Sequence, residues 1–253
     1  LEKMDIYGGN TNAGEVIYND QTVVEAHKHD EVHFTQALNS NTLTGGDLAP
    51  GNYYLTGDID LSADGKNAVS IQITGTVNLC LNGYSIRSNA SAGIFRIGAG
   101  GELNVYDCNG SEEGNGMITE TGKTDHNPIF LHSGGTLRLY GGKIEAYRTA
   151  IVIDEDPAAD ADPDMTGGTV YIHGGTVSST ETGYQAIKVN ANMTDTAVYI
   201  QGGTVTSNNR GISAESGEIH ISGGMVRGTK YALEASAAST SRVYLSGSPT
   251  LSG

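Results

Sequence analysis

The sequence is poor in basic residues and lacks any long run of apolar residues. Its 253 residues include 14 Lys and Arg against 29 Asp and Glu, which gives a formal net charge of −15. Nucleic acids and anionic membrane surfaces bind to basic protein faces, so neither is expected as a partner. No apolar run approaches the ~20 residues that a membrane-spanning helix requires, so no membrane span is predicted.

Motifs of common enzyme classes are also missing. No Gly-x-Gly-x-x-Gly lies between a strand and a helix, so the 36 glycines do not indicate nucleotide binding. No His-Glu-x-x-His or Gly-x-Ser-x-Gly indicates a metalloprotease or a serine hydrolase. His27, His29 and His33 could bind zinc, although a polar strand explains that segment more simply. The chain contains two cysteines, Cys80 and Cys108, which form either a disulfide or two separate thiols.

The chain contains instead a repeated strand pattern. Each copy has a short alternating strand, a Gly-Gly corner and a second short strand, as in GGTVYIHGGTVSS from Gly167 to Ser179. A second series of short strands precedes these copies, with the first apolar residues Ile94, Ile129, Ile151, Ile187, Ile212 and Leu233. The smallest interval, from 212 to 233, is 21 residues, which leaves room for three short strands per coil. The pattern predicts an all-β protein, a single-stranded right-handed parallel β-helix of the pectate-lyase type.

Alternation along each strand predicts which side chains fill the coil. The expected inward pairs are Val170/Ile172, Val198/Ile200, Ile219/Ile221 and Val243/Leu245. Residues 1–50 lack the Gly-Gly repeat, so we predict an N-terminal cap there and the β-helix over residues 51–253. Because the sequence stops in mid-repeat, we expect it to be part of a longer protein; the alternative is a C-terminal coil that packs on something else.

Several segments carry a resemblance to a known group of proteins. They are HKHDEVHFTQAL, APGNYYLTGDIDLS, VNLCLNGYSI and LNVYDCNG, followed by the GGTV coils. Together they resemble the β-helical repeat modules of large extracellular and cell-surface, adhesin-like proteins of gut Firmicutes. The resemblance spans residues 26–253 and implies a secreted or wall-attached modular protein. It implies no catalytic residues, and the acidic insertion from Asp154 to Asp164 departs from the plain repeat units.

The first candidate site is a polar column at the ends of the upstream strands. Adjacent coils stack ~4.8 Å apart, so the backbones of Asp154 and Glu215 are expected about 9–10 Å apart. This spacing fits the two carboxyls of an inverting glycoside hydrolase. His132 would orient or titrate Asp154. The alternatives are a glycan-binding groove that includes Asn190, and a solvated corner. The full column is Ile97, His132, Asp154, Asn190, Glu215 and Ser236.

The second candidate site is an aromatic column on the outside of the middle strands. Its aligned positions are Asn104, Arg138, Tyr171, Tyr199, His220 and Tyr244. Tyrosine rings present an apolar face with a polar tip, which suits stacking against sugar rings, so Tyr171, Tyr199, Tyr244 and Arg138 are candidate ligand-binding residues. The alternative is a structural ladder, because cross-strand aromatic pairs stabilise a sheet by roughly 0.2–1 kcal/mol each.

The third candidate site is the acidic loop. Asp160, Asp162 and Asp164 alternate, as ligands of hard cations often do, and they would bind calcium. The alternative is a solvated loop, which its Ala, Pro and Asp content also favours.

Taken together, these features predict a secreted or cell-surface binding and spacer module directed at glycans. The other hypothesis is a glycan-active β-helical enzyme, a glycoside hydrolase or polysaccharide lyase, that uses an Asp/Glu pair. The expected partner is a neutral glycan or a host or cell-surface polysaccharide, because the acidic charge disfavours uronates. Other domains of a longer parent chain are expected neighbours. The expected location is extracellular.

Overall fold

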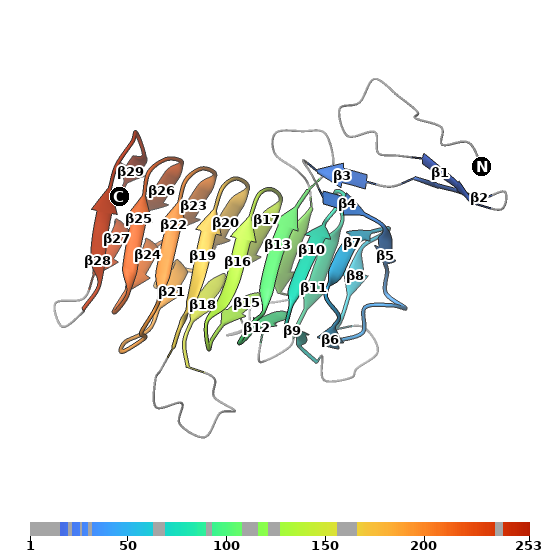
Figure 1. The fold of residues 1–253 in the computed structure, drawn as a ribbon. Helices are drawn as coiled ribbons and strands as arrows, with labels where there is room; N and C mark the ends of the chain where they lie inside the picture. Colours follow the sequence, from blue (N-terminus) through green and yellow to red (C-terminus); the bar gives the residue numbers. More distant parts are fainter. Residues whose placement is uncertain are drawn as a thin grey trace.

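The computed structural model describes residues 32–62, 69–89, 93–107, 116–120, 127–155, 166–235 and 240–253, together with the backbone of three short strands between residues 16 and 29. In these ranges the chain forms strands and turns. They wind into the predicted right-handed parallel β-helix, in which each coil contributes one strand to each of three sheets (Figure 1). No helix in the described ranges is long and apolar enough to cross a membrane.

We name the three parallel sheets by their strands. Sheet 1 contains β5 (Gln36–Leu38), β7 (Gly51–Leu55), β10 (Thr76–Cys80), β13 (Glu102–Tyr106), β16 (Gly135–Leu139), β19 (Gly168–Ile172), β22 (Ala197–Ile200), β25 (Glu218–Ile221) and β28 (Arg242–Leu245). Sheet 2 contains β8 (Ile59–Asp60), β11 (Ser85–Ser88), β14 (Met117–Glu120), β17 (Lys143–Ala146), β20 (Thr176–Ser179), β23 (Thr204–Ser207), β26 (Met225–Gly228) and β29 (Thr250–Ser252). Sheet 3 contains β6 (Gly46–Leu48), β9 (Ile71–Ile73), β12 (Phe95–Ile97), β15 (Ile129–Leu131), β18 (Ile151–Ile153), β21 (Gln185–Val189), β24 (Arg210–Ala214) and β27 (Tyr231–Ala235).

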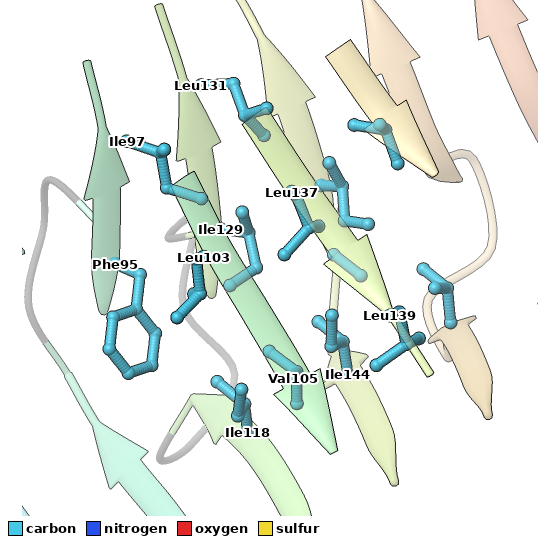
Figure 2. Packing of buried hydrophobic residues seen from close by; sticks show 14 of the residues in the cluster. Phe95, Ile97, Leu103, Val105, Ile118, Ile129, Leu131, Leu137, Leu139 and Ile144 are labelled. Carbon is cyan, nitrogen blue, oxygen red and sulfur yellow. The ribbon is translucent and has the colours of Figure 1, made fainter. Parts of the chain in front are cut away.

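Aliphatic side chains fill the interior of the coil in columns. Val170 pairs with Val198 and Ile172 with Ile200, as predicted, and all four are buried. Figure 2 shows the same arrangement in earlier coils, where Leu137 and Leu139 of β16 point into the interior with residues of the other two sheets. Because each inward residue meets its counterpart in the next coil, the hydrophobic contacts run along the whole solenoid.

Glycine occupies the corner between sheets 1 and 2 for a steric reason. Gly203 has a φ of +65°, and a Cβ atom there would lie 2.6 Å from the carbonyl oxygen of Gly175 in the preceding coil. An L side chain therefore fits neither the backbone conformation nor the space at this corner. The Gly-Gly pairs of the repeat are consequently architectural.

The predicted register of sheet 3 is wrong by one residue in one coil. Phe95, not Ile94, pairs with Ile129, and Ile97 pairs with Leu131 rather than with His132. Ile94 and Phe95 are both apolar and both buried, so alternation alone did not distinguish which one begins the inward set.

The N-terminal region contributes to the solenoid before residue 51. Strands β5 and β6 are already the end strands of sheets 1 and 3. Ahead of them, β1 (Val16–Asn19) pairs with β2 (Thr22–Glu25), and β3 (His27–His29) pairs with β4 (Val32–Phe34), both antiparallel. At the end of β4, Phe34 packs with Cys80 and Tyr106 in a small second cluster outside sheet 1.

Candidate functional site

The outer face of sheet 1 carries the predicted aromatic column in the predicted register. We call Tyr171, Tyr199, His220 and Tyr244 the first aromatic column. The ring centroids of Tyr171 and Tyr199 are 4.7 Å apart, those of Tyr199 and His220 are 4.7 Å apart, and those of His220 and Tyr244 are 4.5 Å apart. The planes of neighbouring rings differ by 7°, 17° and 10°. The rings therefore stack from coil to coil along the solenoid axis.

This stacking determines which part of each ring a ligand could reach. Tyr199 lies between Tyr171 and His220, so both faces of its ring are covered. The far face of Tyr171 is covered by the Arg138 guanidinium, whose Cζ lies 4.0 Å from the ring centroid. The edges and hydroxyls remain accessible, because Tyr199 is only half-buried. At Tyr171 and Tyr199 a sugar could therefore reach the ring edges and hydroxyls but not the ring faces.

Arg138 is held in place by an acidic neighbour on the preceding coil. Its Nε donates to Glu102 Oε1 at 2.9 Å. Partial burial opposes the charge of Arg138, but the hydrogen bond and the charge of Glu102 outweigh it and raise the pKa of Arg138. Arg138 remains cationic and acts as the end of the aromatic stack.

Before Arg138 the same outward row consists of asparagines. Asn78 Nδ2 donates to Asn52 Oδ1 at 2.7 Å, and Asn104 Nδ2 donates to Asn78 Oδ1 at 3.0 Å. This amide ladder was only partly recognised in the sequence, where Asn104 was aligned with the column. The row is therefore a hydrogen-bonded amide ladder over three coils, and Arg138 occupies the next position after Asn104.

A second aromatic column lies two residues further along the strands, and sequence reasoning missed it. It consists of Tyr106, Tyr140 and His173, with centroid distances of 4.7 Å and 4.6 Å and interplanar angles of 9°. The planes of the Tyr171 and His173 rings are parallel within 2° and their centroids are 6.0 Å apart, so the two columns meet there. The sequence does contain a pattern that indicates this column, because each of these aromatic residues directly follows the second inward aliphatic residue of its strand.

His173 makes the stability of this face dependent on pH. Burial, together with the charge of Arg138, lowers the pKa of His173, while a hydrogen bond with Gln201 acts in the opposite direction. The folded protein then binds a proton at His173 less readily than the unfolded chain does. This contribution to stability is complete above the ordinary histidine pKa of about 6.5 and declines as the pH falls below it.

We therefore expect His173→Phe, which keeps a ring in the stack, to reduce the loss of stability between pH 7.5 and pH 5.5. Urea midpoints of the wild type and the variant at both pH values measure this difference. His220→Phe is the matched control, since it replaces a stacked histidine and leaves His173 in place. An equal loss in wild type and His173→Phe would contradict the assignment.

Four of the six predicted residues form the polar column at the ends of the sheet 3 strands. The backbone amides of His132, Asp154, Asn190 and Glu215 each donate to the preceding coil at equivalent positions. Ile97 does not belong to this column, for the reason given above, and Gly98 lies beneath the His132 ring. Ser236 lies outside the described residues.

Asn190 separates the two candidate catalytic carboxylates. It lies on the coil between Asp154 and Glu215, and its Nδ2 donates to Asp154 Oδ2. Asp154 Oδ1 in turn accepts from the amide of Glu155. His132 is nearly buried, with its Nδ1 3.2 Å from Ser133 Oγ. The Asp154 carboxylate is therefore engaged within the protein on both oxygens.

Two predicted metal sites have different outcomes. Asp160, Asp162 and Asp164 lie outside the described residues. The predicted zinc site involved positions 27, 29 and 33. In the antiparallel pair of β3 and β4, position 33 is opposite position 28. Because positions alternate between the two faces of a strand, position 33 is on the face opposite to that of positions 27 and 29. In the ranges that the structure describes, no three His, Cys, Asp or Glu residues are grouped to hold a metal ion.

The open question of the cysteines has an answer for Cys80. Cys80 is disulfide-bonded, and the sequence holds one other cysteine, Cys108, which lies outside the described residues. The bond is located beside the second aromatic column, because Cys80 pairs with Tyr106 between neighbouring strands.

Comparisons with known protein families, curated proteins and solved structures gave no match.

Proposed function

We propose that this chain is an extracellular or cell-surface spacer and binding module that contacts neutral glycans through the outer face of sheet 1. The observation that carries the proposal is the row of tyrosine edges along the stacked coils. The hydroxyls of Tyr140, Tyr171 and Tyr199 make no hydrogen bond to another residue in the described part of the chain. The hydroxyls of Tyr171 and Tyr199 recur at the coil spacing in the first aromatic column, and that of Tyr140 lies in the second column. All three are available to the hydroxyls of a sugar.

The architecture supports the spacer role. The nine strands of sheet 1 extend over roughly 40 Å at the usual strand spacing. Neighbouring coils contact each other through the aliphatic columns inside the solenoid, and through the amide ladder and the ring stacks on its outer face. Contacts on both faces of the sheet therefore stabilise the solenoid. The disulfide at Cys80 supports an extracellular location, because such bonds persist in oxidising compartments.

The polar column supports binding rather than hydrolysis. An inverting glycosidase needs open space for a water and a sugar between its two carboxyls. Asn190 occupies the intervening coil and is hydrogen-bonded to Asp154, one of the two carboxylates. If the column nevertheless hydrolysed a glycan, Asp154→Asn would abolish turnover, and the hydrolase hypothesis would replace ours.

The binding proposal is tested by removing hydroxyls without disturbing the stack. After a glycan array identifies a neutral oligosaccharide, calorimetry should show that Tyr199→Phe weakens its binding by about 0.5–1.5 kcal/mol, the usual net value of one hydrogen bond. The ring stays, so the stability of the variant should be unchanged.

Tyr84→Phe is the matched control, because Tyr84 is a solvent-accessible tyrosine that lies outside the two aromatic columns. If no neutral glycan binds at millimolar concentration, or if both variants bind like the wild type, the glycan part of the proposal fails and the spacer role remains.

A further inference from the structure

The middle of sheet 1 carries a short strip in which each coil offers one hydrogen-bonding tip. Arg138, Tyr171 and Tyr199 occupy equivalent outward positions on β16, β19 and β22, which lie side by side in Figure 1. We call these three residues the central strip. The Cζ of Arg138 lies 4.0 Å from the centroid of the Tyr171 ring, and the ring centroids of Tyr171 and Tyr199 are 4.7 Å apart. The central strip therefore repeats at the coil spacing along the solenoid axis.

Each residue of the central strip keeps a group for a ligand. The hydroxyls of Tyr171 and Tyr199 make no hydrogen bond to another residue in the ranges that the structure describes. The Nε of Arg138 donates to Glu102, but a guanidinium carries five N–H donors in all. Three consecutive coils therefore each present a donor at the same position.

The protein itself closes the central strip at both ends. On the preceding coil the same row holds Asn104, which is only 6% exposed and belongs to the amide ladder. On the following coil it holds His220, whose Nε2 lies 3.1 Å from Glu218 Oε2. The hydroxyl of Tyr244, one coil further, donates to the same carboxylate at 3.3 Å. The part of the row that a ligand can use is thus three coils long.

The side chains that flank the central strip on these three coils are uncharged. They are Thr136, Thr169 and Ala197 on one side, and Tyr140, His173 and Gln201 on the other. His173 is neutral at pH 7, because burial and the charge of Arg138 lower its pKa. The charge of Arg138 is itself balanced by Glu102. In a chain with a net charge of −15, this neutral area favours an uncharged ligand over a polyanion or a polycation.

We propose that the ligand of this face is a neutral, extended, β-1,4-linked polysaccharide that lies along the solenoid axis, with one sugar beside each residue of the central strip. The inference rests on the function proposed above, and it names the class and the direction of the glycan.

The shape of such a polysaccharide matches the central strip. Both linkages of each ring are equatorial, so each sugar advances the chain by about one ring length, which is close to the usual coil spacing of about 4.8 Å. Every sugar carries hydroxyls on both edges of the chain, so one lies beside every coil even though successive rings alternate in orientation. The ring planes of Tyr171 and Tyr199 differ by only 7°, so their tips point in nearly the same direction. An α-1,4-linked chain coils and turns its hydroxyls away from such a straight row.

NMR titration of the full chain with oligosaccharides of increasing length tests the proposal. With β-1,4-linked glucose or mannose, we expect the affinity of at least one series to rise roughly fivefold per sugar up to the third, the net effect of one hydrogen bond, and to level off at the fourth. Maltotriose, which is uncharged but α-1,4-linked, should bind at least about tenfold more weakly than the matching β-1,4 trisaccharide. Because no charges are paired, the affinity should be the same in 0.05 M and 0.5 M salt.

Two conservative variants test the direction of the chain. Tyr171→Phe and Tyr199→Phe should each weaken binding of the β-1,4 trisaccharide roughly fivefold, because each removes one hydroxyl from a different sugar and leaves the ring in the stack. Ser222→Ala is the matched control, since it removes an exposed hydroxyl of the same face outside the central strip, and it should leave the affinity unchanged. A chain that lay across the coils would respond to one of the two tyrosine variants alone.

Failure of this inference differs from failure of the proposed function. If a neutral glycan binds but the affinity stops rising at the disaccharide, if maltotriose binds equally well, or if one tyrosine variant alone has an effect, the extended axial ligand is wrong and the glycan-binding function stands. Tighter, salt-sensitive binding of polygalacturonate would overturn the neutral class. If no neutral oligosaccharide of either linkage and no neutral glycan of the array binds at millimolar concentration, both proposals fail.

Discussion

Replacing Ile187 with alanine is expected to lower the free energy of unfolding by about 2–5 kcal/mol. Ile187 is completely buried on β21, between Ile151 of the preceding coil and Ile212 of the next. Truncation removes contacts to both neighbours and leaves a cavity in the middle of the rod. The surrounding backbone is held by ladder hydrogen bonds on both sides, so it has little freedom to collapse into the space. Urea unfolding of the two proteins measures the difference.

Lys188→Ala is the control for this experiment. Lys188 is the next residue of the same strand and points outward, and surface changes of this kind usually stay within about 0.5 kcal/mol. A loss below about 1 kcal/mol for Ile187→Ala would contradict the assignment of Ile187 to the interior.

Breaking the disulfide at Cys80 is expected to destabilise the protein by about 2–4 kcal/mol, the typical contribution of such a bond. Cys80 is fully buried in the cluster with Phe34 and Tyr106, where the N-terminal segment packs on sheet 1. We therefore expect loss of the bond to loosen this segment first, which amide hydrogen exchange of β4 and β10 would detect. Unfolding with and without reductant measures the global effect.

The Cys80→Ala variant gives the internal control. It should match the reduced wild type in stability, and reductant should have no further effect on it. Equal stability of oxidised and reduced wild type would show that the bond contributes nothing to the fold.

The fold was predictable because the same strand register recurs in successive copies of the repeat. The inward pair Val170 and Ile172 recurs as Val198 and Ile200 and again as Ile219 and Ile221, at the same distance from a Gly-Gly corner. A slip of one residue would expose every aliphatic side chain of a strand, so the pattern permits a single alignment. Where two apolar residues are adjacent, as at Ile94 and Phe95, that argument loses its force and the prediction was one residue out.

The candidate sites were less predictable, because their chemistry depends on contacts across coils. The alignment correctly placed Tyr171, Tyr199 and His220 in one row. It did not indicate that the rings lie face to face, which determines whether a ligand meets a face or an edge. Asp154 and Glu215 were likewise placed in one column, but the side chain of Asn190 between them and its hydrogen bond to Asp154 depend on rotamers.

The sequence by itself determined the strand series, the inward columns and the outward aromatic row, because alternation and corner glycines are local properties of the chain. The tertiary structure alone decided how these rows are used. Side-chain orientation covers the ring faces of Tyr171 and Tyr199 and places the Asp154 carboxylate in its hydrogen bond with Asn190. Tyr199 shows the reason: alternation along its strand turns the ring outward, but only the stacking of neighbouring coils places Tyr171 and His220 against the two faces of that ring.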